Sequence, residues 1–134
     1  MLRGLVAALC ALACLPSLAQ NYPARPVKIV VPFGVGGPAD IDGRYIASKL
    51  QDALGHPFVV EDRPGAGSIV GSDAVAKSAP DGYTLLIMSN THTVNETLVP
   101  KKPFDLMKDF APITGINYSD LMMVIHPSVP AQNL

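Results

Sequence analysis

The sequence predicts an α/β fold built on a parallel sheet, and three observations lead to this class. Short, largely apolar runs occur at 27–31, 58–61 and 83–88, and each has the length of a strand. A loop of glycine, proline or small polar residues follows each run. Helical spacing of apolar residues lies between the first two runs. Repetition of strand, loop and helix predicts right-handed βαβ units and therefore parallel strands.

The clearest helix follows the first strand. Asp40 is a good N-cap, so we expect the helix to begin directly after it, and Gly55 is expected to end it. Gly43 lies in the first turn, where glycine costs roughly 1 kcal/mol relative to alanine, so it is expected to pack closely against another element. The apolar face of this helix is formed by Ile41, Tyr45, Ile46, Leu50, Ala53 and Leu54.

The later elements are shorter. Ser68 is the expected N-cap of a helix that reaches about residue 78, and a short helix is expected at 94–98. A last apolar strand is predicted at 121–125, before His126. These elements extend the same alternation of strand and helix.

The first 19 residues have the pattern of a cleavable secretory signal peptide, with a basic start, an apolar core and a small-x-small end at Ser17-Leu-Ala19. Both cysteines, Cys10 and Cys14, lie inside this segment, so no disulfide is expected in the mature chain. Lipidation of Cys14 is the alternative. The expected location is the periplasm. Without Arg3 the mature chain has 9 basic and 11 acidic residues and no basic run, so nucleic acid is not an expected partner.

Two loops are predicted to form a binding site for a small anion, because ligands of parallel sheets bind outside the carboxyl ends of the strands. The first, here called the glycine loop, offers backbone N–H groups and consists of Phe33, Gly34, Val35, Gly36, Gly37, Pro38 and Ala39. The second, here called the polar segment, offers hydroxyl, amide and imidazole groups and consists of Ser89, Asn90, Thr91, His92 and Thr93. Each charge-assisted hydrogen bond to a carboxylate contributes about 1.5–3 kcal/mol. The alternative is that both are ordinary tight turns.

A rival hypothesis is a nucleotide-cofactor-binding oxidoreductase fragment. Gly34-x-Gly36-x-x-Ala39 matches the dinucleotide pattern, and Glu61 ends the next strand where a ribose-binding acid would lie. Pro38 argues against this because it removes an N–H that a pyrophosphate would use, and Asp40 adds a competing negative charge. Export would also separate the protein from the nicotinamide pool.

Catalytic and metal sites are weakly supported. His92 with Ser89 and Thr91 could suggest a nucleophile and base, but no G-x-S-x-G motif and no acid partner accompany them. No cluster of histidine, cysteine or acidic residues has metal-ligand spacing. We therefore expect no enzymatic activity, no metal and no cofactor.

Several motifs in order resemble one known family, the Bug-type periplasmic receptors of tripartite tricarboxylate transporters. The resemblance covers the whole mature chain in register. It rests on Tyr22-Pro-x-Arg-Pro-Val-x-Ile-Val-Val-Pro-Phe33, Gly36-Gly-x-x-Asp40, Val60-Glu-Asp-Arg-Pro-Gly-Ala-Gly67, Ala74-Val-Ala-Lys-Ser-Ala-Pro-Asp-Gly-Tyr-Thr-Leu-Leu86, Thr91-His-x-x-Asn95, Lys108-Asp-Phe-Ala-Pro-Ile-Thr114 and His126-Pro-Ser-Val-Pro-Ala131.

The resemblance implies a type II periplasmic-binding-protein fold with two lobes. It also implies a small carboxylate or amino-acid-like ligand between the lobes and a membrane permease as partner. Carried over to this chain, the ligand carboxylate would meet the glycine loop with Asp40, and the polar segment with Asn95. Residues 20–125 would form part of the first lobe and 126–134 the start of the crossover. The second lobe would be largely missing, as in a truncated receptor. An interaction or sensor module is a further alternative.

The chain departs from the family pattern at three places. Gly34-Val35 stands where further prolines are common, Asn90 replaces a usual glycine, and Glu96 replaces a usual proline. These departures bear on which ligand is bound more than on how it is bound.

Overall fold

The computed structural model describes residues 22–118, 120, 122 and 124–130. The predicted signal peptide, with Cys10 and Cys14, lies outside these residues. Within the described residues, three strands and three helices alternate. In order they are β1 (Val27–Val31), α2 (Pro38–Leu54), β2 (Phe58–Asp62), α3 (Ile69–Ala76), β3 (Thr84–Leu86) and α4 (Asn90–Leu98).

The strands form one parallel sheet in the order β2-β1-β3, which confirms the predicted α/β class. In the register of β1 with β2, Val27 is opposite Phe58. In the register of β1 with β3, Lys28 is opposite Thr84. The central strand is the most buried element, as its β-branched run predicts, because neighbours cover it on both edges and both faces.

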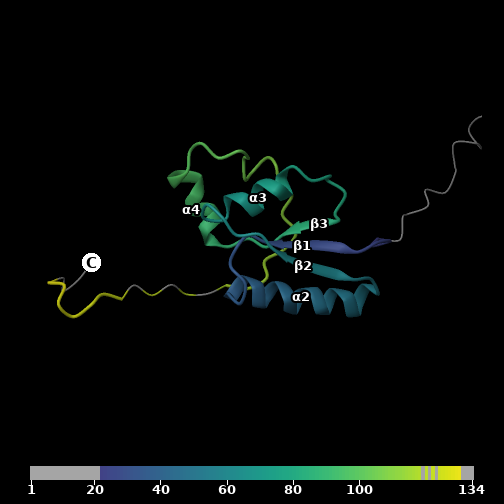
Figure 1. The fold of residues 1–134 in the computed structure, drawn as a ribbon, viewed down its shortest axis with the longest axis horizontal. Helices are drawn as coiled ribbons and strands as arrows, with labels where there is room; N and C mark the ends of the chain where they lie inside the picture. Colours follow the sequence, from purple (N-terminus) through teal and green to yellow (C-terminus); the bar gives the residue numbers. More distant parts are fainter. Residues whose placement is uncertain (1–21, 119, 121, 123, 131–134) are drawn as a thin grey trace, which may run out of the picture.

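Helices cover both faces of the sheet. Figure 1 shows α2 on one face, where it packs against β1 and β2, and α3 with α4 on the other, where α3 packs against β1 and β3. The buried core lies between these layers and consists of Val27, Ile29, Val31, Ala47, Phe58 and Ile87. This arrangement points the carboxyl ends of all three strands in one direction, here called the carboxyl edge.

The boundaries of α2 differ from the prediction at one end. The helix begins at Pro38 with Gly37 as its N-cap, so the prediction that Asp40 caps the helix is wrong. Proline fixes φ at a helical value and lacks only an N–H that the first turn could not use, so it suits this position. At the other end, Gly55 has φ 70° and its N–H donates to the Gln51 carbonyl at 2.9 Å, as predicted.

The predicted start of the last helix, at residue 94, is wrong. Helix α4 begins at Asn90, so most of the polar segment is helical rather than a loop. Ser89 is the N-cap, and its Oγ accepts a hydrogen bond from the Thr91 N–H at 3.3 Å. Helix α3 and strand β3 are both shorter than predicted.

The predicted strand at 121–125 is not formed by the residues of this stretch that the structure describes. Met122, Val124 and Ile125 are exposed and belong to no strand, while Leu121 and Met123 lie outside the described residues. A strand needs a neighbour to pair its N–H and C=O groups, and no partner strand for this stretch is present in the described part of the chain. In the part of the chain that the structure describes, no helix is long and apolar enough to cross a membrane.

Two glycines let helices approach the sheet closely. A Cβ on Gly43 would lie 3.0 Å from the Val31 Cγ2, which confirms the expected close packing of α2 on β1. A Cβ on Gly71 would lie 2.7 Å from both the Arg63 carbonyl oxygen and the Pro32 Cβ. Helix α3 therefore rests directly on the backbone that leads from β1 into the glycine loop.

We predict that Gly71→Ala destabilises the chain by roughly 1–3 kcal/mol, because the added methyl group overlaps backbone that cannot move freely. At an unconstrained helical position the same change would instead stabilise by about 1 kcal/mol. Urea unfolding followed by circular dichroism measures the difference. Gly115→Ala is the control, since its Cβ would meet nothing within 4 Å. A neutral or stabilising Gly71→Ala would contradict the close packing.

Candidate functional site

The glycine loop and the polar segment lie together at the carboxyl edge. They follow β1 and β3, which are adjacent parallel strands, so both leave the sheet at the same edge. Figure 1 shows the chain after β1 and the start of α4 at the same end of the sheet. The Phe33 and His92 rings meet edge to face, with their centroids 5.7 Å apart. The structure therefore brings the two predicted segments into contact.

The glycine loop presents exposed backbone at this edge. Gly34, Val35, Gly36 and Pro38 are all exposed, and Phe33, Gly37 and Ala39 are half-buried. The Gly37 N–H donates to the Gly34 carbonyl at 3.3 Å, which closes the turn. Gly36 has φ 78°, a value that favours glycine. Ala39 is the second helical residue, so its N–H has no acceptor within the helix and is free to meet a ligand.

Asp40 stabilises the glycine loop through a hydrogen bond. Its side chain is only 4% exposed, and its Oδ2 accepts a hydrogen bond from the Gly36 N–H at 2.7 Å. Its Oδ1 is paired with the Arg44 Nε at 2.6 Å, and another Arg44 nitrogen lies 2.7 Å from the Asp62 Oδ2. Each carboxylate oxygen of Asp40 therefore has a partner within the chain, and the carboxylate fixes the shape of the loop.

Arg44, which pairs with Asp40, was not among the site residues predicted from the sequence. It joins the start of α2 to the end of β2, so it ties two loops of the carboxyl edge together. Arg44 follows Asp40 by four residues, and this spacing could have predicted the ion pair because residues i and i+4 are neighbours on a helix. The link to Asp62 had no comparable signal.

His92 is buried within the protein instead of facing solvent. It is 3% exposed, and both ring nitrogens have protein partners. Nδ1 lies 3.1 Å from the Ser89 backbone nitrogen, and Nε2 lies 3.0 Å from the Ser72 Oγ. No ring nitrogen is left for a ligand. Within the polar segment, the residues nearest solvent are Asn90 and Thr93, with Thr91 half-buried.

The Asn95 side chain also forms a hydrogen bond within the protein at the carboxyl edge. Its Nδ2 donates to the Gly67 carbonyl at 2.7 Å, which ties α4 to the loop that follows β2. That loop ends at the same edge, and Gly65, Ala66, Gly67 and Ser68 all have positive φ. Sequence reasoning missed Ser72 as a neighbour of His92, because a separation of 20 residues leaves no periodic signal.

Glu61 is not a free acid. Its two carboxylate oxygens lie 2.6 Å from the Lys28 Nζ and 2.7 Å from an Arg63 nitrogen. The hydrogen bond from Lys28, supported by Arg63, lowers the pKa of Glu61. Pro38 at the first helical position provides no N–H for a pyrophosphate. The geometry therefore offers little to a dinucleotide, and no metal-binding cluster is found among the described residues.

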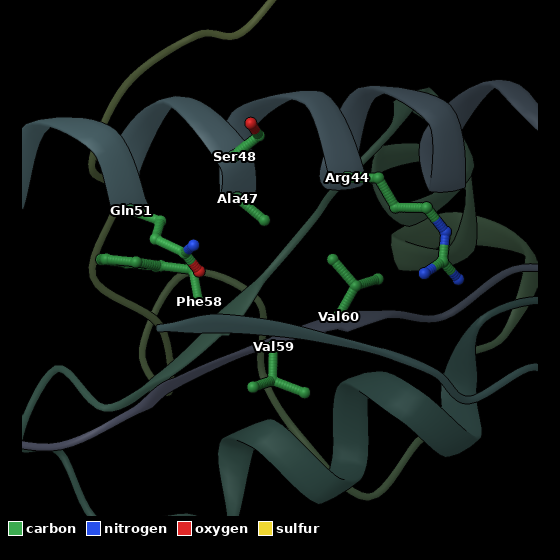
Figure 2. Close-up of a pocket in the computed structure, with 7 residues that line it drawn as sticks. All are labelled: Arg44, Ala47, Ser48, Gln51, Phe58, Val59 and Val60. Atoms are coloured by element: carbon green, nitrogen blue, oxygen red, sulfur yellow. The ribbon is translucent and has the colours of Figure 1, made fainter. Parts of the chain in front are cut away.

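A shallow groove lies away from these segments. It has a volume of about 470 Å³ and runs between α2 and the edge strand β2. Figure 2 shows Phe58 and Val60 on the side of β2 that faces α2, whereas Val59 points away from the helix. Its lining is Arg44, Ala47, Ser48, Gln51, Phe58, Val59 and Val60. None of the predicted site residues contributes to it.

We predict a pH dependence of stability that comes from His92. Burial lowers its pKa from the ordinary value of 6.5, against a smaller opposing effect of the Ser89 backbone. The unfolded chain therefore binds a proton more readily, and the free energy of unfolding falls as the pH drops below 6.5 towards the lowered pKa. Urea unfolding at several values between pH 7.5 and 5 measures this slope. His92→Gln, which retains His56 and His126, should show a shallower slope, and equal slopes would contradict the assignment.

The chain matches known proteins over most of its length. Residues 43–134 match the family model described as tripartite tricarboxylate transporter family receptor. The protein BugT of Bordetella pertussis is 42% identical over 121 residues, which cover 89% of this chain and 37% of BugT. A UPF0065 protein of the same organism is 36% identical over 100% of this chain and 42% of its own length. The chain thus spans about two fifths of the length of these relatives.

Solved structures support the same grouping. A periplasmic transporter has a TM-score of 0.63 at 38% identity, covering 65% of this chain and 30% of that one. MatC from Rhodopseudomonas palustris, solved with bound malate, has a TM-score of 0.62 at 39% identity, covering 68% and 31%. Such partial coverage is consistent with one lobe of a periplasmic binding protein. The family consists of receptors and not enzymes, so the oxidoreductase alternative is not supported. This chain belongs to the tripartite tricarboxylate transporter receptor family, which includes the Bug proteins.

Proposed function

We propose that this chain is the carboxylate-capturing lobe of an extracytoplasmic receptor, with the ligand held between the glycine loop and the polar segment. The observation that carries the proposal is the contact of these two segments at the carboxyl edge, where the Phe33 and His92 rings pack. Crevices at this edge are where open parallel sheets bind ligands.

The electrostatics of the edge favour an anion. Helices α2 and α4 both begin there, so their positive ends lie on the same side of the sheet. Asp40, the buried acid closest to the glycine loop, is paired with Arg44 and does not leave an uncompensated negative charge. A carboxylate would therefore meet N–H and hydroxyl donors without a nearby free carboxylate to repel it.

The site residues divide into two roles under this proposal. Ligand contacts come from the exposed backbone of the glycine loop, including the Ala39 N–H, and from Asn90, Thr91 and Thr93. Support comes from Asp40, His92 and Asn95, whose side chains bond to other parts of the chain. The sequence-based site included all of these residues as ligand contacts, and we assign the last three to positioning.

The family supports a ligand class and a partner for this proposal. MatC was solved with malate, so a small dicarboxylate is the ligand class we propose for this chain. Membership of a family of transporter receptors supports delivery to a membrane permease from the periplasm. Removal of the predicted signal peptide on export is part of the same proposal. Because the relatives are more than twice as long, we propose that a second lobe encloses the ligand in the complete receptor.

Malate binding mapped by ¹H–¹⁵N NMR tests the proposed site, because chemical shifts report weak as well as tight binding. Shifts are expected for the amides of the glycine loop and of residues 90–93. Thr91→Val and Thr93→Val, combined, should weaken binding roughly 10- to 100-fold, since each removes a donor to a charged group. Thr84→Val is the matched control, because Thr84 begins β3 at the opposite edge. Shifts confined to the groove between Arg44 and Phe58, or no shifts at all, would contradict the proposal.

A further inference from the structure

His92 connects three parts of the carboxyl edge through buried contacts. Its Nδ1 faces the Ser89 backbone at the start of α4, and its Nε2 faces Ser72 in α3. The third part is the glycine loop, because the Phe33 ring packs against the imidazole. Ser72 is fully buried and His92 nearly so, so water does not compete for these contacts. Every hydrogen in this network must therefore be accounted for by protein partners.

The position of the Ser72 hydroxyl hydrogen is determined by the Ser68 carbonyl. The Ser72 Oγ lies 2.9 Å from this carbonyl oxygen, which can only accept. The same carbonyl accepts from the Ser72 backbone N–H at 3.1 Å. With its single hydroxyl hydrogen donated to Ser68, the Ser72 Oγ accepts from His92 at 3.0 Å. It follows that the Nε2 of His92 carries a hydrogen.

The other end of the imidazole gives the same answer independently. Nδ1 lies 3.1 Å from the Ser89 backbone N–H and 3.2 Å from the Ser89 carbonyl oxygen. The carbonyl already accepts from the His92 backbone N–H at 3.0 Å, whereas the Ser89 N–H has no other acceptor among the described residues. Nδ1 therefore serves as the acceptor of the Ser89 N–H. A neutral imidazole with hydrogen on Nε2 and none on Nδ1 satisfies both ends. The result is a one-way chain of hydrogen bonds from the Ser89 N–H through His92 and Ser72 to the Ser68 carbonyl, here called the His92 relay.

We propose that His92 is a positioning residue of the carboxylate site, and that the His92 relay fixes the first turn of α4 to the first turn of α3. The consequence for ligand binding rests on the proposed function, whereas the relay itself does not. Without the relay, the contacts that still hold the start of α4 would include the Ser89 cap on Thr91 and the Asn95 contact to Gly67. The donors of Asn90, Thr91 and Thr93 would then be less well aligned with the glycine loop.

The capping arrangement explains why a histidine suits this position. Ser89-Asn-Thr-His92 has the spacing of a capping box, in which the third helical residue returns a side chain to the N-cap N–H. Glutamate or glutamine usually occupies this position, and its side chain bonds to the N-cap N–H. Histidine caps with one nitrogen and still has a second nitrogen on the far side of the ring, which reaches Ser72.

The test uses Ser72→Ala, with Ser78→Ala as its matched control. Ser78 also donates its hydroxyl hydrogen to a carbonyl of α3, that of Val75 at 2.7 Å, but it does not contact His92. His92→Asn is a second test variant, because its side chain can still cap Ser89 but is too short to reach Ser72. The tautomer of His92 is read from long-range ¹H–¹⁵N spectra of the side chain, and the order of the first turn of α4 from amide hydrogen exchange.

We expect a single Nε2–H tautomer for His92 in the unsubstituted chain. Ser72→Ala should give mixed tautomers and should speed amide exchange across residues 89–93 by roughly three- to tenfold, the equivalent of one neutral hydrogen bond. His92→Asn should speed exchange in the same way. Ser78→Ala should leave both measurements unchanged. An Nδ1–H tautomer, or unaltered exchange in Ser72→Ala and His92→Asn, would overturn the relay.

Malate titrations of the same variants separate the relay from the proposed function. Affinity should fall roughly three- to tenfold in Ser72→Ala and remain unchanged in Ser78→Ala. If Ser72→Ala loosens residues 89–93 but binds malate as tightly as the unsubstituted chain, the positioning role is wrong. If the unsubstituted chain binds no malate, the proposed function fails, and the tautomer and exchange measurements alone decide the relay.

Discussion

Parallel pairing of β1 with both of its neighbours is the constraint on which the rest of the structure depends. Because all three strands point the same way, the loops that follow them leave the sheet at one edge. Helices α2, α3 and α4 then all begin at that edge, so backbone N–H groups and helix N-termini gather there. The register of a five-residue apolar strand thus places two segments more than 50 residues apart in the sequence next to one another.

Two polar networks hold this edge in shape. Arg44 connects Asp40 beneath the glycine loop to Asp62 at the end of β2, and the His92 relay connects α4 to α3. In these networks Asp40 and His92 are buried and bonded to protein partners, whereas the Arg44 side chain is half exposed. In binding sites generally, the groups that contact the ligand are held in place by other groups whose hydrogen bonds are made within the protein.

The parts of the fold that the sequence predicted well are those with strong local signals. The β-branched run of β1 and the apolar spacing of α2 gave the correct element types, and Gly43 gave the correct close contact. The start of α4 was missed because Asn90, Thr91 and Thr93 are weak helix formers, so the segment has loop composition. The caps formed by Ser89 and His92 override that weak preference.

The sequence predicted that the glycine loop and the polar segment share one edge of the sheet, but not which protein groups their side chains contact. Strand order and the loop compositions indicated where the two segments meet. Which polar groups face solvent depended on contacts between distant residues, such as Asp62 with Arg44 and Ser72 with His92, and no periodic pattern encodes these. The stretch at 121–125 shows the same limit, because its apolar composition fits a strand but the described residues include no partner for it.

A crystal structure of the chain with bound malate tests the central claim most directly. The account predicts one malate carboxylate within hydrogen-bonding distance of both the glycine loop and the polar segment. It also predicts that Asp40 and His92 keep their present protein partners. A carboxylate held by only one of the two segments, or bound in the groove between α2 and β2, would contradict it.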